Sequence, residues 1–317
     1  MILSKIDSLN EYASMVNKKS KCAVVVAYKP ELLSLFDNLQ RCMLQVDRLI
    51  LVDNGSSVQI QEKMAQFSEV LGFEILLLKE NLGVAAAQNH GIKRARDAGF
   101  GYVLLLDQDS SPQPGMVNAL SRTLAELVGQ GINVAAVGPR LLDRRTKTST
   151  PFVRVRMFGV TRHAYEPGEP FAIATDFLIS SGMMIPLSVI DSVGLPEEEL
   201  FIDNVDLEWC FRARSKGYSL FGVGDAVMEH AVGDHVTQLG GHAIYRHSPL
   251  RQYYMMRNRI VLYQRSYSPW GWVIQDVIRL LFKIAIFSIF LAPRRQNIHM
   301  MIIGIRDGIR EKLGKFH

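Results

Sequence analysis

Short apolar runs alternate with segments of helical spacing along roughly the first 140 residues of the chain. Uninterrupted apolar runs are typical of strands buried on both faces, and apolar residues three or four positions apart indicate amphipathic helices. The predicted strands are Cys22–Ala27, Arg48–Asp53, Phe73–Leu78 and Tyr102–Leu106. The predicted helices are Glu31–Leu44, Ile60–Leu71 and Val84–Ala98. This alternation predicts an α/β fold in which helices flank a mostly parallel sheet and ligands bind beyond the carboxyl ends of the strands.

Beyond Pro139 the pattern becomes less regular. The segment Arg140–Pro170 is charged and interrupted by prolines, so we expect an excursion or a loop there. Ala174–Pro186 has the composition of one strand with a kink at its Ser-Ser-Gly sequence, and Asp203–Ser215 has helical spacing. No linker in this region is clear enough to divide it into separate domains.

Polar side chains follow the predicted strands at the points where they end. These residues are Asp53, Asn81, Asp107 and Asp109. Asp107 and Asp109 are two positions apart, so on an extended chain both face the same side. Two neighbouring carboxylates are costly unless a cation lies between them, and hard oxygen ligands suit Mg²⁺ or Mn²⁺ bound together with phosphates. In isolation the same sequence, followed by Ser111-Pro112, is more often a solvated turn, and the other motifs of the chain decide against it.

Several common nucleotide and hydrolase motifs are missing from the sequence. No Gly-x-Gly-x-x-Gly follows the first strand, no Gly-Lys-Ser/Thr phosphate loop is present, and there is no Gly-x-Ser-x-Gly elbow. This argues against a dinucleotide-binding Rossmann fold, a nucleoside triphosphatase and an α/β hydrolase. What remains is a nucleotide-binding α/β sheet that handles a diphosphate through a metal ion.

The charge of the chain is divided unevenly along its 317 residues. From Gly241 to the end there are 13 Lys and Arg against 3 Asp and Glu, so the first 240 residues carry 23 basic and 28 acidic residues. The composition, 48% hydrophobic and 21% charged, is that of a globular protein. The cysteines Cys22, Cys42 and Cys210 are scattered, and no secretory signal is evident in Met1–Lys21. We therefore expect a reducing, cytoplasmic environment.

The most hydrophobic stretch lies in this basic tail, at Trp270–Pro293. Asp276, Arg279 and Lys283 interrupt it, so it is a poor match to the ~20 apolar residues that span a membrane. We expect a catalytic domain over 1–265 and a helical, basic-amphipathic extension over 266–317 that lies on an anionic membrane surface. The alternatives are a helix packed on the catalytic domain and a homodimer interface. No nucleic-acid-binding motif accompanies the basic residues, so nucleic acid is not an expected partner.

The motifs of the chain occur together in the order of a known family. They are Val24–Pro30, Leu51–Ser57, Asn81–Gly83, Asn89–Gly91, Leu104–Ser110, Asp176–Gly182, Glu199–Trp209, Glu229–Gly233 and His247–Tyr254 with Arg257-Asn258. Over roughly residues 22 to 265 the sequence resembles the inverting family 2 glycosyltransferases, which have the nucleotide-sugar-binding GT-A fold. The later motifs are similar to those of the bacterial rhamnosyltransferase branch.

The resemblance implies a donor site and a metal site. In the family the first loop lines the base and ribose of the donor, Asp53 accepts a hydrogen bond from the imide N–H of uracil or thymine, and Asp109 ligates the metal. The donor residues implied in this way are Ala27, Tyr28, Lys29, Pro30, Asp53, Asn81, Gly83, Asn89, Asp107, Gln108 and Arg257. The implied metal ligands are Asp109, Asp107 and His230, and the ion is Mg²⁺ or Mn²⁺. Arg251, Arg257 and Asn258 either close over the diphosphate or belong to the basic surface.

Inversion at the anomeric carbon requires a base on the acceptor side. If Asp203–Ser215 is a helix, Asp203 and Asp206 lie on one face of it. The family's common Glu-Asp pair is absent, so alignment leaves both residues open; we favour Asp206. The implied acceptor-binding residues are Ser181, Gly182, Glu208 and Trp209. Glu208 has an alternative partner in Arg212 or Arg214, and Trp209 has an alternative place in the core.

The resemblance thus implies a cytoplasmic enzyme on the inner face of the bacterial plasma membrane. The expected reaction moves L-rhamnose from dTDP-L-rhamnose to a hydroxyl of a surface glycan or glycolipid, of the O-antigen, lipopolysaccharide-core or rhamnolipid type. A transferase of the same fold with a UDP-sugar donor is the nearest alternative, followed by a non-catalytic glycan-binding or scaffold subunit. A nucleotidyltransferase is disfavoured because Val24–Pro30 lacks a glycine-rich, basic loop.

Overall fold

A computed structural model describes residues 20–143, 148–157, 159–165, 172–230, 236–239, 242–245, 248–290 and 293–316. Its main element is a sheet with the strand order β3-β2-β1-β4-β10-β6-β11-β5, in which β9 pairs with β11. The strands of this sheet are β1 (Lys21–Ala27), β2 (Arg48–Asp53), β3 (Glu74–Leu77), β4 (Tyr102–Asp107), β5 (Ser111–Pro112), β6 (Val134–Asp143), β9 (Ala172–Thr175), β10 (Met184–Pro186) and β11 (Ser219–His230). A further two-stranded sheet joins β12 (Val236–Leu239) to β13 (His242–Tyr245).

The first four strands of the sheet are parallel and in close register. Ala27 of β1 pairs with Asp53 of β2, and Val26 pairs with Asp107 of β4. The apolar runs of β1, β2 and β4 are buried, as expected for strands covered on both faces, whereas β3 at the end of the sheet is only partly buried. The register therefore places Asp53 and Asp107 on either side of the end of β1, as the sequence predicts.

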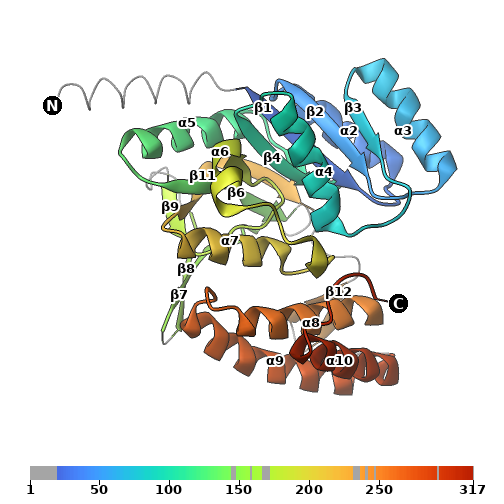
Figure 1. Cartoon of the computed structure of the whole chain (residues 1–317), viewed down its shortest axis with the longest axis vertical. Coiled ribbons are helices and arrows are strands. Elements are labelled where there is room, and N and C mark those ends of the chain that lie inside the picture. Colours follow the sequence, from blue (N-terminus) through green and yellow to red (C-terminus); the bar gives the residue numbers. More distant parts are fainter. Residues whose placement is uncertain are drawn as a thin grey trace.

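Helices cover both faces of the sheet (Figure 1). One core joins the sheet to α2 (Leu32–Met43), α3 (Val58–Leu71) and α5 (Met116–Gly129). The other core joins it to α4 (Val84–Asp97), α6 (Leu187–Val193) and α7 (Val205–Ser215). The predicted class, an α/β fold with a mostly parallel sheet flanked by helices, is confirmed.

The second half of the chain differs from its sequence-based description in three places. Arg140–Pro170 is not simply a loop. It contains the end of β6 and a hairpin of β7 (Phe152–Arg156) and β8 (Gly159–His163). Residues 144–147, 158 and 166–170 of this segment lie outside the described residues. Ala174–Pro186 forms two strands, β9 and β10, instead of one kinked strand. Between them Gly182 adopts a φ of 87° and donates its N–H to the Leu105 carbonyl, which ties this connection to β4 just before β10 begins.

The third correction concerns the segment Asp203–Ser215. The helix α7 begins only at Val205, because Asp203 and Asn204 have φ values of 65° and 61°, in the left-handed region. A short turn, η1 (Glu198–Leu200), precedes them. Asp203 and Asp206 are thus not on one helical face: Asp203 lies in the loop that leads into the helix.

The expected C-terminal helices are present as α8 (Pro249–Gln264), α9 (Trp270–Phe290) and α10 (Arg294–Ile309), below the sheet in Figure 1. They share a core of Met256, Leu280, Phe287 and Met301. In the described part of the chain, no helix is both long and apolar enough to cross a membrane. The division between 265 and 266 stays a prediction, and α8, which precedes it, packs along α10.

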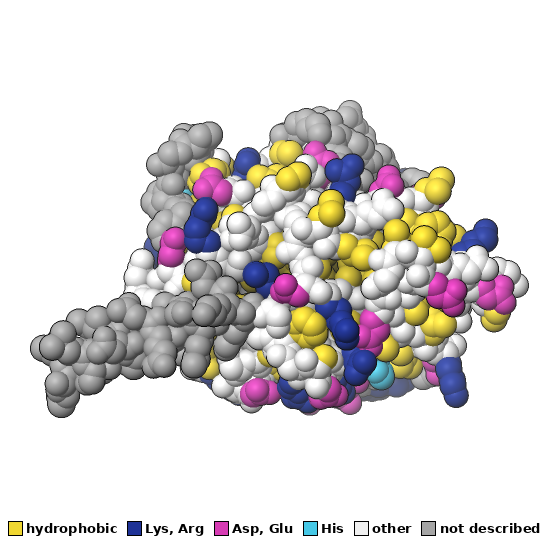
Figure 2. Space-filling view, turned by 90° about the horizontal axis from the view of Figure 1, so that it is seen from above, with side chains coloured by type: hydrophobic (Ala, Val, Ile, Leu, Met, Phe, Trp, Pro, Cys, Tyr) yellow, Lys and Arg dark blue, Asp and Glu magenta, His cyan; other side chains and the backbone are white. Residues whose placement is uncertain are grey.

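The surface above the sheet carries both signs of charge. On the face seen in Figure 2, Lys and Arg side chains alternate with Asp and Glu, and neither sign gathers into a large patch.

Candidate active site

Asp53 provides a buried hydrogen-bond acceptor at the end of β2. Its side chain is fully buried, and Oδ2 accepts hydrogen bonds from the Ser56 N–H at 2.9 Å and from Gln61 Nε2 at 2.7 Å. The other oxygen, Oδ1, is buried and finds no hydrogen-bond donor among the residues that the structure describes. A buried carboxylate oxygen without a donor is costly, so this atom is suited to receive the N–H of a ligand.

The loop after β1 lies beside Asp53. The Tyr28 N–H donates to Gln108 Oε1 at 2.8 Å, and the Lys29 N–H donates to Ser56 Oγ at 2.8 Å. Lys29 has a φ of 47°, so this loop turns sharply, while Pro30 is buried where it leads into α2. The bond from Tyr28 ties the first loop to the Asp107–Asp109 loop, which brings two separate parts of the predicted donor site together.

Asn81 shapes the next loop through its own hydrogen bonds. Its Oδ1 accepts from the Gly83 N–H at 2.9 Å and from Asn54 Nδ2 at 3.2 Å. Gly83 has a φ of 92°, and a Cβ atom there would lie 2.6 Å from the carbonyl oxygen of Phe201. A glycine is therefore required at this position, where the loop meets the segment that leads into α7.

Asn89 lies deeper than the sequence suggests. Its side chain is 1% exposed, and Nδ2 donates to the Pro196 carbonyl at 2.9 Å and to Glu198 Oε1 at 2.8 Å. In this position Asn89 holds the segment before η1, and it would act on a ligand only through that segment.

Two carboxylates face each other across the loop between β9 and β10. The hydroxyl of Ser181 donates a hydrogen bond to Asp107 Oδ2, and the neighbouring Ser180 N–H lies 3.3 Å from Asp206 Oδ2. Asp206 also accepts from the Leu207 N–H at 2.8 Å. Burial, with smaller contributions from the charges of Asp107 and Asp203, raises the pKa of Asp206 to about 6. A carboxylate with this pKa is a competent general base near neutral pH.

Asp203 is engaged differently. Arg251 Nη2 lies 3.1 Å from Asp203 Oδ1, and Arg251 Nε lies 3.1 Å from Oδ2, a two-pronged ion pair. Asn258 Nδ2 donates to the backbone carbonyls of Leu200, Ile202 and Asp203 at 2.8–2.9 Å, which fixes the strained loop. The guanidinium occupies the lone pairs that a general base would use.

Three predicted ligand contacts are buried in the protein. Glu208 is fully buried and bonds to Arg212, at 2.7 and 2.8 Å, and to the Tyr267 hydroxyl at 2.7 Å. Trp209 is 1% exposed, and its indole N–H donates to the Gly194 carbonyl at 2.8 Å. The structure thus gives both residues a place in the core, and we do not carry them forward as acceptor contacts.

The third buried residue is Arg257, expected at the diphosphate. It is fully buried under the Tyr254 ring and donates to the carbonyls of Glu199, Leu200 and Gly314. Its guanidinium therefore holds the chain end against η1. We do not carry it forward as a phosphate contact.

The predicted metal ligands lie on two neighbouring segments. Glu229 pairs with Ser111, so the backbone of His230 lies beside the loop that carries Asp109, although the His230 side chain is outside the described residues. Among the residues that the structure describes, no three His, Cys, Asp or Glu side chains form a metal-binding group. Asp107 and Asp109 offer carboxylate oxygens, which fits an ion that completes its coordination with substrate phosphates.

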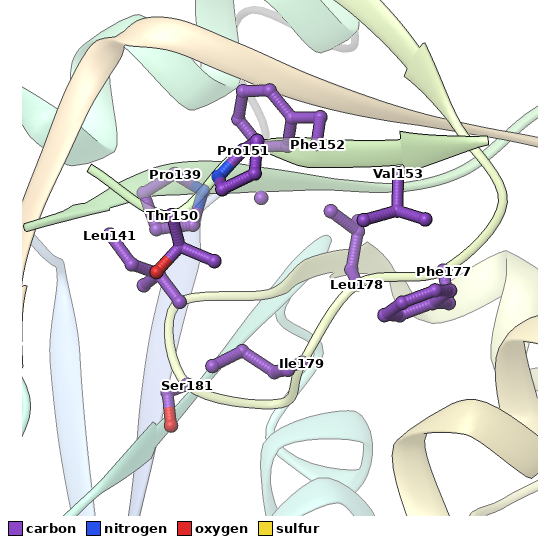
Figure 3. A pocket seen from close by; sticks show the side chains of 11 residues that line it. Pro139, Leu141, Thr150, Pro151, Phe152, Val153, Phe177, Leu178, Ile179 and Ser181 are labelled. Carbon is purple, nitrogen blue, oxygen red and sulfur yellow. The ribbon is translucent and has the colours of Figure 1, made fainter. Parts of the chain in front are cut away.

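An apolar pocket of about 430 Å³, part of it open to solvent, lies behind the loop that carries Ser181 (Figure 3). Pro139, Phe152 and Leu178 enclose it, while the Ser181 oxygen points away from these side chains. The pocket is thus on the far side of the loop from Asp107.

Two polar groups of the site were not identified from the sequence. They are Gln61, which holds Asp53, and the backbone N–H of Ser180, which bonds to Asp206. A signal for Gln61 was available: it lies three residues before the buried Met64, on the inward face of an amphipathic helix. The Ser180 contact depends on a backbone group, and no side-chain pattern reports it.

The comparisons with known proteins agree with this geometry. Residues 22–183 match the model of Glycosyl transferase family 2, so the chain belongs to this family of glycosyltransferases. It is 31% identical over 293 residues to the dTDP-rhamnosyl transferase RfbF of Shigella flexneri. This match covers 91% of this chain and 95% of that protein. It is also 31% identical to the chondroitin synthase of Escherichia coli, over 29% of this chain and 12% of that protein.

Solved structures show the same fold at low sequence identity. GalNAc-T7 with UDP, GalNAc and Mn²⁺ matches 92% of this chain and 56% of its own, with a TM-score of 0.59 and 12% identity. The mannosyltransferase PcManGT from Pyrobaculum calidifontis, in complex with GDP-Man and Mn²⁺, matches 98% of this chain and 100% of its own, with a TM-score of 0.55 and 13% identity. The GT-A fold and the membership in family 2 predicted from the motifs are confirmed.

Proposed function

We propose that this glycosyltransferase moves L-rhamnose from dTDP-L-rhamnose to a hydroxyl of a cell-surface glycan or glycolipid. The observation that carries the transfer reaction is Asp206, a carboxylate with a raised pKa beside Asp107 at the carboxyl edge of the sheet. The choice of donor rests on the likeness to RfbF along nearly the whole of both chains.

The base of the donor is held at Asp53. A carboxylate only accepts hydrogen bonds, and thymine and uracil each offer one imide N–H. Asp53 Oδ1 is buried and has no donor, while Oδ2 is already held by Ser56 and Gln61. The imide N–H therefore completes the hydrogen bonding of this carboxylate. Ala27, Tyr28, Lys29 and Pro30 line the base and ribose, and Asn81, Gly83 and Gln108 shape the loops on either side.

Asp206 acts as the general base of the inverting step. Its carboxylate takes the proton of the acceptor hydroxyl while that oxygen attacks the anomeric carbon from the face opposite the diphosphate. The bond between the anomeric carbon and the phosphate oxygen breaks, and its electrons leave with the nucleoside diphosphate. Ser181 and Gly182 lie at this point of the loop and are the acceptor contacts that remain in the proposal.

Asp109 and Asp107, with His230, would hold the Mg²⁺ or Mn²⁺ ion. The bound ion supplies a Lewis acid for the leaving diphosphate. The protein's own residues orient these carboxylates. Ser181 holds Asp107 by donating a hydrogen bond to its side chain. The Ser110 N–H donates to the Asp107 carbonyl at 3.0 Å, and the turn closed by this bond presents Asp109.

The C-terminal helices give the proposal its location. The outward face of α9 exposes apolar side chains at helical spacing, with Trp270 75% and Phe282 67% exposed. The full set on this face is Trp270, Ile274, Val277, Ile278, Leu281 and Phe282. Arg279, Arg294 and Arg295 are exposed beside it. An apolar stripe flanked by arginines suits the headgroup region of an anionic bilayer, and we propose that the protein binds the inner face of the plasma membrane there.

The function is tested with a donor panel measured by calorimetry in the presence of Mn²⁺. We expect dTDP-L-rhamnose to bind more tightly than UDP-glucose, UDP-galactose and GDP-mannose. Because the thymine methyl is a single apolar contact worth ~1–3 kcal/mol, preference for a UDP-sugar would retain the mechanism and replace the donor. Binding of none of these donors would contradict the proposed function and favour a non-catalytic glycan-binding subunit.

The location is tested separately by sedimentation with vesicles and by light scattering. We expect the protein to sediment with anionic phosphatidylglycerol vesicles and the double variant Leu281→Asp/Phe282→Asp to remain in solution. A homodimer that dissociates in the double variant, without vesicle binding by the wild type, would assign the stripe to a subunit interface instead.

A further inference from the structure

The loop that leads into α7 has a backbone conformation that residues with a side chain rarely adopt. Phe201 has a φ of 66° and a ψ of −63°, and the Ile202 N–H donates to the Leu200 carbonyl at 2.7 Å. This is the γ-turn with a positive φ, which is rare and strained. Asp203 and Asn204 follow with φ values of 65° and 61°, in the left-handed region. Such a loop persists only where the surrounding contacts hold it.

Asn258 of α8 supplies several of these contacts. Its side-chain Nδ2 donates to the backbone carbonyls of Leu200, Ile202 and Asp203 at 2.9, 2.8 and 2.8 Å. Asn258 is fully buried, and its two N–H bonds are shared among three carbonyls. Its Oδ1 accepts from Arg257 Nε at 2.9 Å, so a rotated amide would lose both sets of bonds. One side chain thus holds the backbone on both sides of the γ-turn.

The loop lies between the two sides of the reaction centre. On the donor side, the Phe201 carbonyl accepts the Val84 N–H at 2.7 Å, at the start of α4. On the acceptor side, the Asn204 carbonyl accepts the Glu208 N–H at 2.9 Å, at the start of α7. Asp206 lies in the first turn of this helix. The place of the Asp206 carboxylate therefore depends on where the loop starts α7.

The sequence would allow a more ordinary start to α7. Asparagine is a preferred N-cap residue, and a usual N-cap has an extended backbone and a side-chain bond to the first turn. Asn204 has a left-handed backbone instead, and its side chain makes no cap bond. Local preferences are given up in this way mainly where function requires a particular geometry. Without its clamp, we expect the loop to relax toward the ordinary cap and to carry Asp206 with it.

We propose that Asn258 is a positioning residue for the transfer reaction, which holds the loop Phe201–Asn204 so that Asp206 meets the acceptor hydroxyl. This inference rests on the proposed function, in which Asp206 is the general base. In this role Asn258 acts through the loop, and it is neither a diphosphate contact nor part of a basic surface, the two places that the sequence leaves open for it. Because a misplacement of about 1 Å can lower a rate by about 10²-fold, the clamp should act on kcat and not on donor binding.

The first test removes the N–H groups of the clamp. Asn258→Asp retains an oxygen that accepts from Arg257 but offers no donor to the three carbonyls, and Asn258→Leu is an uncharged variant of similar size. We expect kcat, measured by release of dTDP, to fall by about 10- to 100-fold in both variants. It is calculated per dTDP-binding site, counted by calorimetry in Mn²⁺, so that unfolded protein does not enter the comparison. The affinity for dTDP should stay within about two-fold of the wild type, because the donor loops are untouched.

The matched control for this test is Tyr263→Phe, which changes the same helix. It removes the hydroxyl that bonds to Asp276 of α9, away from the loop, so it should lower stability in urea without lowering kcat. Wild-type kcat in both Asn258 variants would overturn the proposal. A loss of dTDP binding together with kcat would make Asn258 a residue of the fold alone and overturn it as well.

The second test relieves the strain in the loop itself. Glycine adopts left-handed conformations readily, so Asn204→Gly should keep the loop in place with less help from Asn258. We expect Asn204→Gly alone to retain the wild-type kcat, and to raise kcat of Asn258→Leu by about two- to five-fold. A residue that contributes stability alone predicts no such rescue under conditions where all variants are folded. The absence of any rescue would contradict the loop as the route by which Asn258 acts.

A double-mutant cycle with Asp206 separates this inference from the proposed function. If Asn258 acts by placing Asp206, Asn258→Leu should lower kcat by less than about two-fold when Asp206→Asn is already present. Two independent losses would overturn the inference and leave Asp206 as the base. Wild-type kcat in the Asn258 variants beside an inactive Asp206→Asn would likewise overturn the inference alone. Wild-type kcat in Asp206→Asn would remove the base from the proposed function, and this inference would fall with it.

Discussion

Arg251 holds the carboxylate of Asp203 in a two-pronged ion pair, with N–O distances of 3.1 Å to both of its oxygens. Three residues further on, Asp206 accepts hydrogen bonds from the backbone N–H groups of Ser180 and Leu207. The two residues that the sequence leaves as alternative bases therefore differ in their surroundings. The oxygens of Asp203 are occupied by a guanidinium, whereas burial raises the pKa of Asp206 to about 6.

The first prediction concerns the identity of the base. We expect Asp206→Asn to lower kcat by about 10²- to 10⁴-fold, the usual contribution of a general base, while donor affinity stays within two-fold. Transfer is measured by release of dTDP, and donor affinity by calorimetry. Asp203→Asn is the matched variant, and we expect it to retain more activity; a larger loss in Asp203→Asn would assign the base to Asp203.

The second prediction is the pH dependence of the reaction. Because the pKa of Asp206 is about 6, its base form is lost as the pH falls below that value. We expect kcat/KM to fall ten-fold per pH unit below about pH 6 and to be level from there to pH 7. A profile that remains level down to pH 4.5, the range of an ordinary carboxylate, would contradict this role of Asp206.

The third prediction tests the role of Asp53. In Asp53→Asn one oxygen can still accept from Ser56 and Gln61, but an NH₂ group then replaces the unpartnered Oδ1. This NH₂ would oppose the imide N–H of the base, so we expect dTDP to bind about 10- to 100-fold more weakly. Calorimetry measures the affinity, and an unchanged circular dichroism spectrum serves as the control for folding. Equal affinity in the variant would place the base elsewhere.

The fourth prediction concerns the divalent ion. We expect EDTA to stop transfer and Mn²⁺ or Mg²⁺ to restore it, and Asp109→Ala to remain inactive at any metal concentration tested. Asp37→Ala, at an exposed carboxylate of α2, is the control and should behave as the wild type does. Full activity in EDTA would show that the carboxylate pair has another task.

The fifth prediction follows from the lowered pKa of Lys283, and stability is its readout. Below pH 8 the folded protein holds a charged lysine at a cost that the unfolded chain does not have. As the pH rises from 8 toward 10.5, the folded protein loses this proton first, so the wild type gains stability. We expect Lys283→Met to be more stable by about 1–3 kcal/mol at pH 7, with the gap closing toward pH 10. Urea unfolding at both pH values measures it, and a less stable Lys283→Met would contradict it.

The sequence predicts the parallel half of the fold well because its signals are local. The strands β1, β2 and β4 are short apolar runs. Asp53 and Asp107 end β2 and β4, and the Tyr28–Pro30 turn follows β1, so their common edge follows from their order alone. The placement of Asp53 and Asp107 needs only this edge and the register.

The acceptor side was harder to predict because it depends on contacts between distant segments. Helical spacing over Asp203–Ser215 is real, but Asn258 and Arg251 of α8 both bond to Asp203 and hold it outside the helix. The burial of Arg257 likewise depends on a distant segment, because its guanidinium donates to the carbonyl of Gly314, more than fifty residues further along the chain. A single charged residue on a helix does not reveal which distant carbonyls it will meet.

The close approach of Gly83 to Phe201 joins the two halves of the site. The Phe201 carbonyl accepts the Val84 N–H at 2.7 Å, and no side chain fits at position 83 between them. The turn that opens α4 and the strained loop that carries Asp203 are therefore built as one piece. A side chain at position 83 would therefore have to be matched by a shift of the segment that carries Phe201. A chimaera of two related transferases should therefore take residues 81–84 and 196–204 from the same parent, because these two segments pack directly against each other.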